Sequence, residues 1–272
     1  MLNPRQKYLQ IALNGTLNEV RQIISQIPRD GRIILEAGYP LIKTYGMEAI
    51  RRMKFWWNPQ FYGTSEKQVS FEMISRNNFL SLFLGTGLKK NIHNFLKQKR
   101  FKEKFFKKEN VSFSPYIVAD LKCMDRAFTE VEAASNAGAS AATCLGLAPL
   151  ETINEFIKRC KELNIDSVLD MMNIEYPFEI LAKLAVPPKI VMLHRGVDEG
   201  ETNREKEMPY HEIARIKDVY DDVLIAVAGG EKINEVMSGA FNDADILVVW
   251  KLFNENPQNI TSISDEFLKE IK

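Results

Sequence analysis

The chain has 272 residues, of which 45% are hydrophobic and 26% charged, and its 36 basic residues balance its 36 acidic ones. These values exclude extensive disorder, and a net charge of zero gives no global reason to expect a nucleic-acid-binding or membrane-surface protein. Three cysteines without ligand spacing, Cys123, Cys144 and Cys160, argue against a disulfide framework and against a zinc site. The sequence shows neither a signal-like segment nor an apolar run long enough to span a membrane, so we expect a soluble, cytoplasmic protein.

Two strand–helix units open the chain. An apolar run at 8–13 predicts a strand, and apolar residues at helical spacing predict a helix at 16–27. The pattern repeats with a strand at 32–37, which contains Glu36 near its end, and a helix at about 45–54. A strand followed by a crossover helix is the unit from which parallel sheets are built.

Residues 55–114 interrupt this alternation. Between Lys89 and Lys108, nine basic residues stand against one acid, Glu103, and four phenylalanines are interleaved with them. A helix here would carry an aromatic stripe and a basic face, so we predict a helical, basic subdomain inserted between the second and third strands. Three roles stay open for it: a solvated excrescence packed on the barrel, a lid or dimer arm that supplies lysines to an anionic substrate, and a patch for nucleic acid or an anionic membrane.

The alternation resumes at residue 115 and continues to the end of the chain. Further strands are predicted at 115–126, 140–147, 166–172, 189–194, 223–228 and 244–250. Helices are predicted at about 126–137, 150–162, 176–184, 209–219 and 231–238 and from about Ser264, with a polar loop at 197–208. Eight such units with largely apolar strands predict an α/β fold, a (β/α)8 TIM barrel that spans 1–272 as one domain.

Charged residues close the third predicted strand. Asp120 and Lys122 are two positions apart, so on a strand their side chains share a face, and Asp125 follows from the loop. Two flanking carboxylates should keep the lysine protonated, and the lysine should keep the carboxylates ionised. The same spacing also fits a surface ion-pair cluster, so it does not define a catalytic site by itself.

Polar residues or glycine also follow most of the other strands: Asn14, Glu36, Asp170, His194 and Gly229. The carboxyl ends of barrel strands build the active site in (β/α)8 enzymes, so this placement predicts an enzyme. His194, which is followed by Arg195 and Gly196, fits the barrel mouth. Asp170 alone fits a carboxylate that braces neighbouring loops better than it fits a site residue.

With these residues in view, the chain resembles the orotidine-phosphate decarboxylase superfamily, and within it the branch of 3-hexulose-6-phosphate synthase and 3-keto-gulonate-6-phosphate decarboxylase. The resemblance rests on a DxKxxD motif at Asp120, Lys122 and Asp125 and on GxPLIKxxG after Glu36. Further similar segments are YLQIALN, TCLGLAPLETI, VLDMM, MLHRGVDEG and IAVAGGEKI.

The resemblance implies a role for five of these positions. Glu36 and Asp120 match carboxylates that hold a magnesium ion, a hard cation usually bound by one or two carboxylates together with water and substrate oxygens. Lys122 matches a lysine beside the developing enediolate oxygen, and His194 matches a histidine that transfers protons. Asp125 matches an aspartate that reaches the neighbouring subunit's site, which implies a homodimer with shared active sites.

Two departures from the family pattern concern the substrate. Asn14 stands where the first strand normally ends in aspartate, which keeps the shape and removes a charge. Trp250 and Lys251 replace a Gly-Arg pair that helps to bind phosphate, and lysine lacks the planar fork of arginine. The expected substrate is a small phosphorylated molecule, and the expected substrate-binding residues are Asn14, Arg195, Gly229, Gly230 and Lys251.

A few positions distinguish the reactions within this branch. The synthase pattern HxGxD is present at His194, Gly196 and Asp198, whereas the decarboxylase pattern HxxR would need an arginine at Val197. The resemblance therefore implies a magnesium-dependent lyase of the aldolase type, which condenses formaldehyde with ribulose 5-phosphate. Two alternatives stay open: a decarboxylase or aldolase of the same superfamily with another substrate, and a non-catalytic barrel that binds a polyanion such as nucleic acid through Lys89–Lys108.

Overall fold

The computed structural model describes residues 2–58, 114–203, 205, 208–230, 233–256 and 258–271. The predicted insertion at 55–114 falls almost wholly outside these ranges, so its helical character and its possible roles stay predictions. Within the described ranges, no helix is both long enough and apolar enough to cross a membrane.

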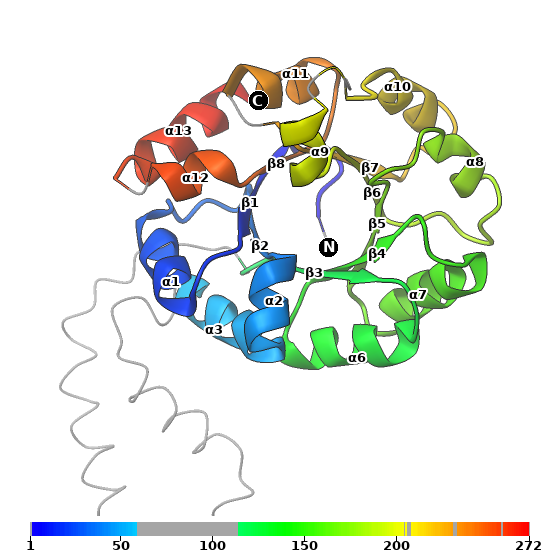
Figure 1. Cartoon of the computed structure of the whole chain (residues 1–272), viewed down its shortest axis with the longest axis horizontal. Coiled ribbons are helices and arrows are strands. Elements are labelled where there is room, and N and C mark those ends of the chain that lie inside the picture. Colours follow the sequence, from blue (N-terminus) through cyan, green and yellow to red (C-terminus); the bar gives the residue numbers. More distant parts are fainter. Residues whose placement is uncertain are drawn as a thin grey trace, which may run out of the picture. The chain divides into compact units, whose positions relative to one another are not determined.

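Eight parallel strands close into a barrel in which each strand pairs with its sequence neighbours and β1 pairs with β8 (Figure 1). The strands are β1 (Tyr8–Leu13), β2 (Ile33–Ala37), β3 (Ile117–Cys123), β4 (Ala141–Leu145), β5 (Asp166–Asp170), β6 (Ile190–His194), β7 (Leu224–Ala228) and β8 (Ile246–Val249). Every predicted strand overlaps one of these, and the predicted (β/α)8 barrel is confirmed.

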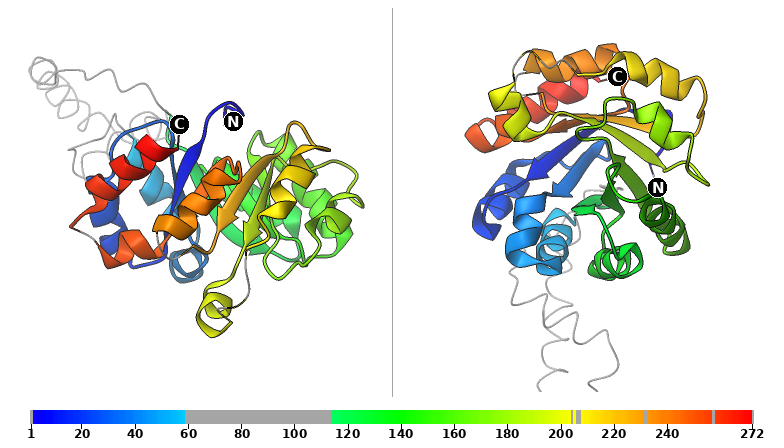
Figure 2. Two further views of the ribbon diagram at one scale, coloured as in Figure 1. Left: turned by 90° about the horizontal axis from the view of Figure 1, so that it is seen from above. Right: turned by 45° about the vertical axis from the view of Figure 1, so that its right-hand side comes forward.

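Helices cover the outer face of the barrel (Figures 1 and 2). The helices in the described part of the chain are α1 (Leu17–Gln26), α2 (Tyr39–Tyr45), α3 (Met47–Trp57), α6 (Ala127–Ala137), α7 (Leu150–Glu162), α8 (Pro177–Leu181), α9 (Val197–Thr202), α10 (His211–Lys217), α11 (Ile233–Phe241), α12 (Lys251–Glu255) and α13 (Ile260–Glu270). The short helix α9 lies at one end of the barrel, and the N-terminus lies at the opposite end (Figure 2).

Alternation along the strands separates two hydrophobic cores. In β1, Leu9, Ile11 and Leu13 belong to the large core between the sheet and the helices, whereas Tyr8 and Ala12 belong to a smaller core inside the barrel. Successive side chains of a strand point to opposite faces, so every second position points into the barrel. The last inward positions of the strands therefore face the space at their carboxyl ends.

Two segments differ from the predicted elements. The start of the predicted loop 197–208 forms α9, where the Glu199 carboxylate accepts a hydrogen bond from the Gly196 amide at 3.3 Å and so satisfies a group at the start of the helix. The sequence predicts one helix at about 45–54, but the chain forms α2 and α3 because Gly46, with φ of 58°, turns the backbone between them. The helix α12 and the first turn of α13 are also absent from the prediction.

Strand β3 is irregular where it reaches the barrel mouth. Its register pairs Ala119 with Ala142 and Cys123 with Cys144, so four steps along β3 correspond to two steps along β4. Within this bulge Lys122 has a φ of 47°, which is uncommon for a residue other than glycine. Bulges change the direction of side chains beside active sites, and this one redirects Lys122.

Candidate active site

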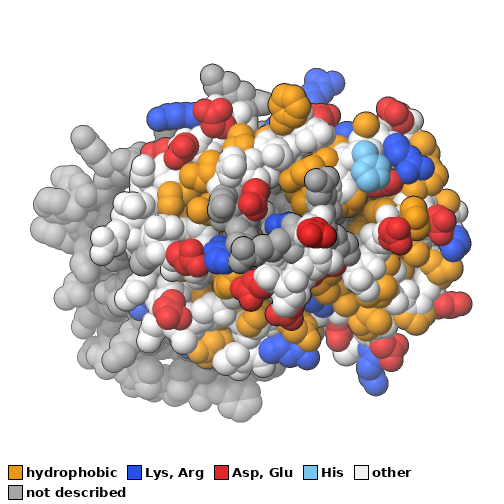
Figure 3. Space-filling view, turned by 45° about the horizontal axis from the view of Figure 1, so that its top comes forward, with side chains coloured by type: hydrophobic (Ala, Val, Ile, Leu, Met, Phe, Trp, Pro, Cys, Tyr) orange, Lys and Arg blue, Asp and Glu red, His pale blue; other side chains and the backbone are white. Residues whose placement is uncertain are grey.

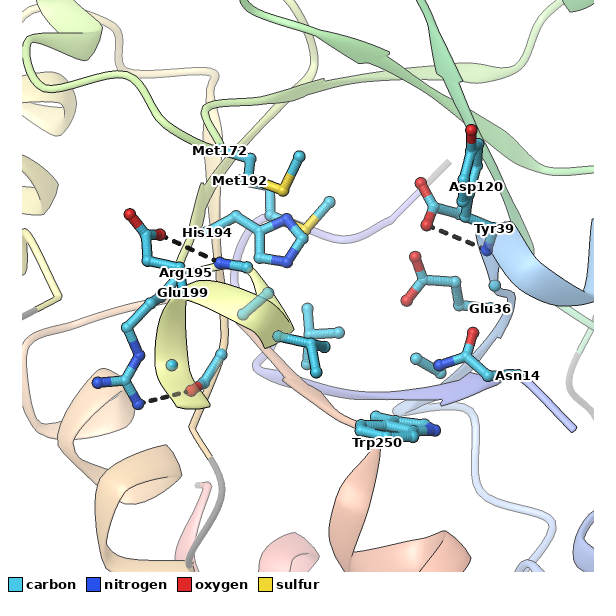
Figure 4. Close-up of a pocket in the computed structure, with 18 of the residues that line it drawn as sticks. Asn14, Glu36, Tyr39, Asp120, Met172, Met192, His194, Arg195, Glu199 and Trp250 are labelled. Carbon is cyan, nitrogen blue, oxygen red and sulfur yellow. Dashed lines mark hydrogen bonds between the residues drawn. The ribbon is translucent and has the colours of Figure 1, made fainter. Parts of the chain in front are cut away.

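A cavity of about 570 Å³ opens at the carboxyl ends of the strands, a volume that suits a small metabolite. Most of the predicted site residues line it: Asn14, Glu36, Asp120, Lys122, His194, Arg195, Gly229, Gly230 and Lys251. Figure 4 shows Glu36, Asp120 and Asn14 on one side of this space and His194 on another. The sequence thus correctly identifies most of the residues that meet at the mouth.

Lys122 lies between two carboxylates on the charged side of the cavity. Its Nζ is 3.0 Å from Asp170 Oδ2 and 3.4 Å from Asp120 Oδ2. Burial alone would lower the pKa of the lysine, but Asp120 and Asp170 outweigh it and raise that pKa above its usual value. Lys122 is therefore a fixed positive charge in the cavity wall.

The second carboxylate beside Lys122 is not the one that the sequence predicts. Asp125 is exposed in the loop between β3 and α6, and it does not line the cavity of its own chain. The expectation that Asp120 and Asp125 flank the lysine is wrong for Asp125, because the bulge of β3 directs Lys122 toward Asp170 on β5. The predicted reach of Asp125 into a neighbouring subunit, and the homodimer itself, stay predictions.

Asp120 is fixed from three sides. Thr143 on β4 donates its hydroxyl to Oδ1 at 2.9 Å, and the amide of Tyr39 at the start of α2 donates to Oδ2 at 3.2 Å. The ammonium of Lys122 provides the third contact, and the residue is only 6% exposed. The neighbouring strand β4, the start of α2 and a lysine of its own strand therefore hold this carboxylate in one orientation.

Asp170 connects Lys122 to His194. His194 Nδ1 lies 2.9 Å from each carboxylate oxygen, and the amide of Met172 donates to Oδ1 at 2.9 Å. Burial alone would raise the pKa of Asp170, but His194 and Lys122 hold it below its usual value. Burial would likewise lower the pKa of His194, and Asp170 raises it instead. The bond at Nδ1 fixes the ring, so Nε2 is the ring atom suited to proton exchange in the cavity.

Glu36 lies near the end of β2, which pairs with β3, the strand that carries Asp120. It is 4% exposed, and Gln10 on β1 donates to its Oε2 at 2.9 Å. Burial, followed by the negative charge of Asp120, raises the pKa of Glu36 to about 7. Two buried carboxylates that repel one another in this way form a pair that a cation would stabilise.

The loops after β6 and β7 form another part of the cavity wall. Gly229 has a φ of 116°, and a Cβ at this position would lie 2.5 Å from the carbonyl oxygen of Arg195. In return, the Arg195 guanidinium donates to the carbonyl of Gly229 at 3.0 Å and lies 3.8 Å from the Glu235 carboxylate. Both loops are thus packed closely against each other, and glycine is required at Gly229.

The structure places in the site some residues that the sequence pattern does not single out as functional. Asp170 is predicted as a bracing residue, although it joins the two principal catalytic candidates. Thr143 and Gln10, which hold Asp120 and Glu36, are not singled out at all. A signal was available, because all three are polar residues at inward positions of buried strands, as Asp120 is.

The residues present fit a magnesium ion. Among the described residues, no group of three or more histidine, cysteine, aspartate or glutamate side chains is placed to bind a metal. Magnesium does not need such a group, since it is usually held by one or two carboxylates while water and substrate supply the other oxygens. Glu36 and Asp120 supply two hard oxygen donors from adjacent strands, and each already has a neutral hydrogen-bond donor that orients it.

Comparison with protein families gives one match over more than half of the chain. Residues 94–249 match the Orotidine 5'-phosphate decarboxylase / HUMPS family. Similar full-length proteins include the bifunctional enzyme Fae/Hps of Methanocella arvoryzae, which is 30% identical over 268 residues, and that of Methanosarcina barkeri, which is 29% identical over 265. These alignments cover 97% of this chain but only 53% and 52% of the relatives, so the chain spans about half the length of these proteins.

Solved structures share the fold. A 3-hexulose-6-phosphate synthase from Salmonella typhimurium superposes with a TM-score of 0.66 and 21% identity, covering 97% of this chain and all of that one. A KGPDC from Streptococcus mutans superposes with a TM-score of 0.60 and 16% identity, covering 98% of this chain and 97% of that one. At this level of identity the superpositions establish the barrel architecture.

Proposed function

Because the chain belongs to the Orotidine 5'-phosphate decarboxylase / HUMPS family, we propose that it is a carbon–carbon lyase that acts on a phosphorylated sugar through an enediolate. The reaction that we place first is the aldol condensation of formaldehyde with ribulose 5-phosphate, the reaction of a 3-hexulose-6-phosphate synthase. The similar Fae/Hps proteins and the structural similarity to a 3-hexulose-6-phosphate synthase support this choice.

One observation carries the proposal. The ammonium of Lys122, which is held between Asp120 and Asp170, lines the same cavity as Glu36 and His194. An enediolate develops negative charge on two oxygens, and a preorganised cation in a partly buried wall stabilises such charge without reorganising. Since its pKa is raised, Lys122 is positively charged throughout the neutral range.

The other residues have separable roles in this proposal. His194 moves the proton between substrate carbon or oxygen and Nε2, while the Asp170 carboxylate stabilises the imidazolium that forms. Glu36 and Asp120 would hold the magnesium ion, which when bound polarises a substrate carbonyl. Arg195, Lys251 and the backbone at Gly229 and Gly230 line the cavity and are proposed to bind the phosphate group.

The reaction can be assigned by comparing substrates. We expect the purified protein with magnesium to consume formaldehyde in the presence of ribulose 5-phosphate, and we expect Lys122→Ala to lower the rate at least a hundredfold at unchanged secondary structure. A panel of phosphorylated keto acids, assayed for released carbon dioxide, tests the decarboxylase alternative. If the protein turned over only a phosphorylated keto acid, it would be a decarboxylase and not an aldolase. If Lys122→Ala kept the wild-type turnover, both the aldolase and the decarboxylase proposals would be refuted.

The face of the molecule shown in Figure 3 gives no support to the polyanion-binding alternative. The face shown in Figure 3 carries acidic and basic side chains interspersed, without a large area of one sign among the residues that are coloured. A nucleic-acid-binding face usually concentrates positive charge. The basic segment Lys89–Lys108 on which this alternative depends lies outside the described residues.

A further inference from the structure

The indole of Trp250 forms part of the cavity wall immediately after β8. Trp250 is half-buried, packs against the core inside the barrel and lines the cavity. In Figure 4 the ring lies beside the space between Asn14 and His194. The ring therefore borders the same space as the catalytic candidates and does not close it, since about 570 Å³ stays open.

Small residues on the neighbouring strands make room for this ring. Val248 pairs with Gln10 on β1 and with Ala228 on β7. Ala12 on β1 and Ala228 on β7 are small members of the core inside the barrel, against which Trp250 packs, and both line the same cavity. Small side chains on the two strands that flank β8 thus leave room for an indole at this corner.

The cavity is lined by apolar side chains as well as by charged and polar ones. Met192, Ala228 and Val248 line the cavity together with Trp250, and all three are buried members of the core inside the barrel. Lys122, with its two carboxylates, lies at the end of β3. A ligand that fills this cavity therefore meets charged groups as well as an aromatic and aliphatic surface.

A sugar phosphate carries polar groups and apolar groups that match this mixed lining. Its carbonyl and hydroxyl oxygens seek charged partners, while the C–H groups of its carbon chain lose unfavourable contact with water when they pack on an aromatic face. We propose that Trp250 is a positioning residue that packs against the carbon chain of the substrate and holds its reacting carbons toward Lys122 and His194. The identity of the ligand in this inference rests on the proposed function.

Tryptophan fluorescence tests the contact independently of turnover. The chain has three tryptophans, Trp56, Trp57 and Trp250, of which Trp57 is fully buried and Trp56 lies on α3 outside the cavity lining. We expect ribulose 5-phosphate to change the emission of the wild type and of the control variant Trp56→Phe with saturation. The change should be lost in Trp250→Phe, whereas calorimetry should show that this variant still binds within threefold of the wild type.

Removing the ring should weaken binding. We expect Trp250→Ala to raise the Kd of ribulose 5-phosphate at least tenfold, and Trp250→Leu, which preserves more of the packing, tests the same point if the alanine variant does not fold. An unchanged Kd in either folded variant overturns the inference, and so does a ligand-induced emission change that persists in Trp250→Phe. A wild type that binds without aldolase activity would refute only the proposed function, and a wild type that binds no sugar phosphate would refute both.

Discussion

Nδ1 of His194 lies 2.9 Å from both carboxylate oxygens of Asp170, which is wholly buried. The same carboxylate lies 3.0 Å from the ammonium of Lys122. Asp170 therefore sets the charge state of the proposed proton carrier and the position of the proposed electrostatic stabiliser together. Changes at this one buried carboxylate should disturb both, although it is not itself part of the cavity lining.

Replacing Asp170 by asparagine should uncouple His194 from its charge partner. The pKa of His194, which Asp170 raises against the effect of burial, should fall, and turnover should fall by about a hundredfold or more because the ring loses its orientation. NMR titration of the ring measures the first effect and steady-state kinetics the second. Asp221→Asn, which changes an exposed carboxylate in the turn before β7, is the control and should leave the pKa of His194 unchanged and turnover within twofold of the wild type. A His194 pKa that stays at its wild-type value in Asp170→Asn would contradict the coupling.

The same pair predicts how stability depends on pH. Burial lowers the pKa of His194, but Asp170 raises it above the ordinary value of 6.5, so the folded state favours the protonated ring. This contribution to the free energy of unfolding is fully present below about pH 6.5 and is lost as the pH rises through the raised pKa. Urea unfolding of the wild type and of His194→Gln between pH 5.5 and 8.5 should show a difference that shrinks with rising pH. A difference that grows with pH would show that the sign is wrong.

The sequence predicts the fold well because most strands end with a change from apolar residues to a polar residue or glycine, as at Glu36 and His194. It predicts Asp120 and Lys122 as neighbours because a period of two places them on one face. It misses Asp170 as the partner of Lys122 because that contact depends on the bulge in β3, where the lysine takes a positive φ that no residue pattern announces. The contact between β3 and β5 also requires that β4 pair with both strands in the observed register, which no local pattern encodes.

Magnesium should bind through Glu36 and Asp120. Addition of magnesium should raise the melting temperature of the wild type, because an ion that binds only the folded state stabilises it by mass action, by about 2.7 kcal/mol at a hundredfold excess over Kd. Glu36→Gln and Asp120→Asn should lose most of this shift. Asp198→Asn should keep it, since this carboxylate lies on α9 and not at the end of β2 or β3. An equal shift in all four proteins would place the ion elsewhere.

Removal of the Lys122 ammonium should separate charge stabilisation from substrate binding. We expect Lys122→Met, which keeps much of the side-chain volume, to lower kcat by about two to three orders of magnitude, while Lys251→Ala should mainly raise KM. Lys122→Met should also melt at a lower temperature, because Asp120 and Asp170 then lose the cation between them. Circular dichroism establishes that the fold is retained. A variant with unchanged kcat would remove Lys122 from the mechanism.

Gly229 and Gly46 form a natural pair for testing how closely the β6 and β7 loops are packed. Both have positive φ, 116° and 58°, so an alanine at either position carries backbone strain of about 1–3 kcal/mol. At Gly229 the added Cβ would lie 2.5 Å from the Arg195 carbonyl oxygen, whereas among the described residues no heavy atom beyond the chain neighbours lies within 4 Å of a Cβ at Gly46. Gly229→Ala should therefore destabilise the protein by roughly 1–3 kcal/mol more than Gly46→Ala in urea unfolding, because the clash adds an overpacking cost.

Since the loop after β7 also lines the cavity, Gly229→Ala should raise KM for the phosphorylated substrate and Gly46→Ala should not. Equal losses of stability in the two variants would show that the loops can separate without cost, and the wall proposed to bind phosphate would then not be preorganised.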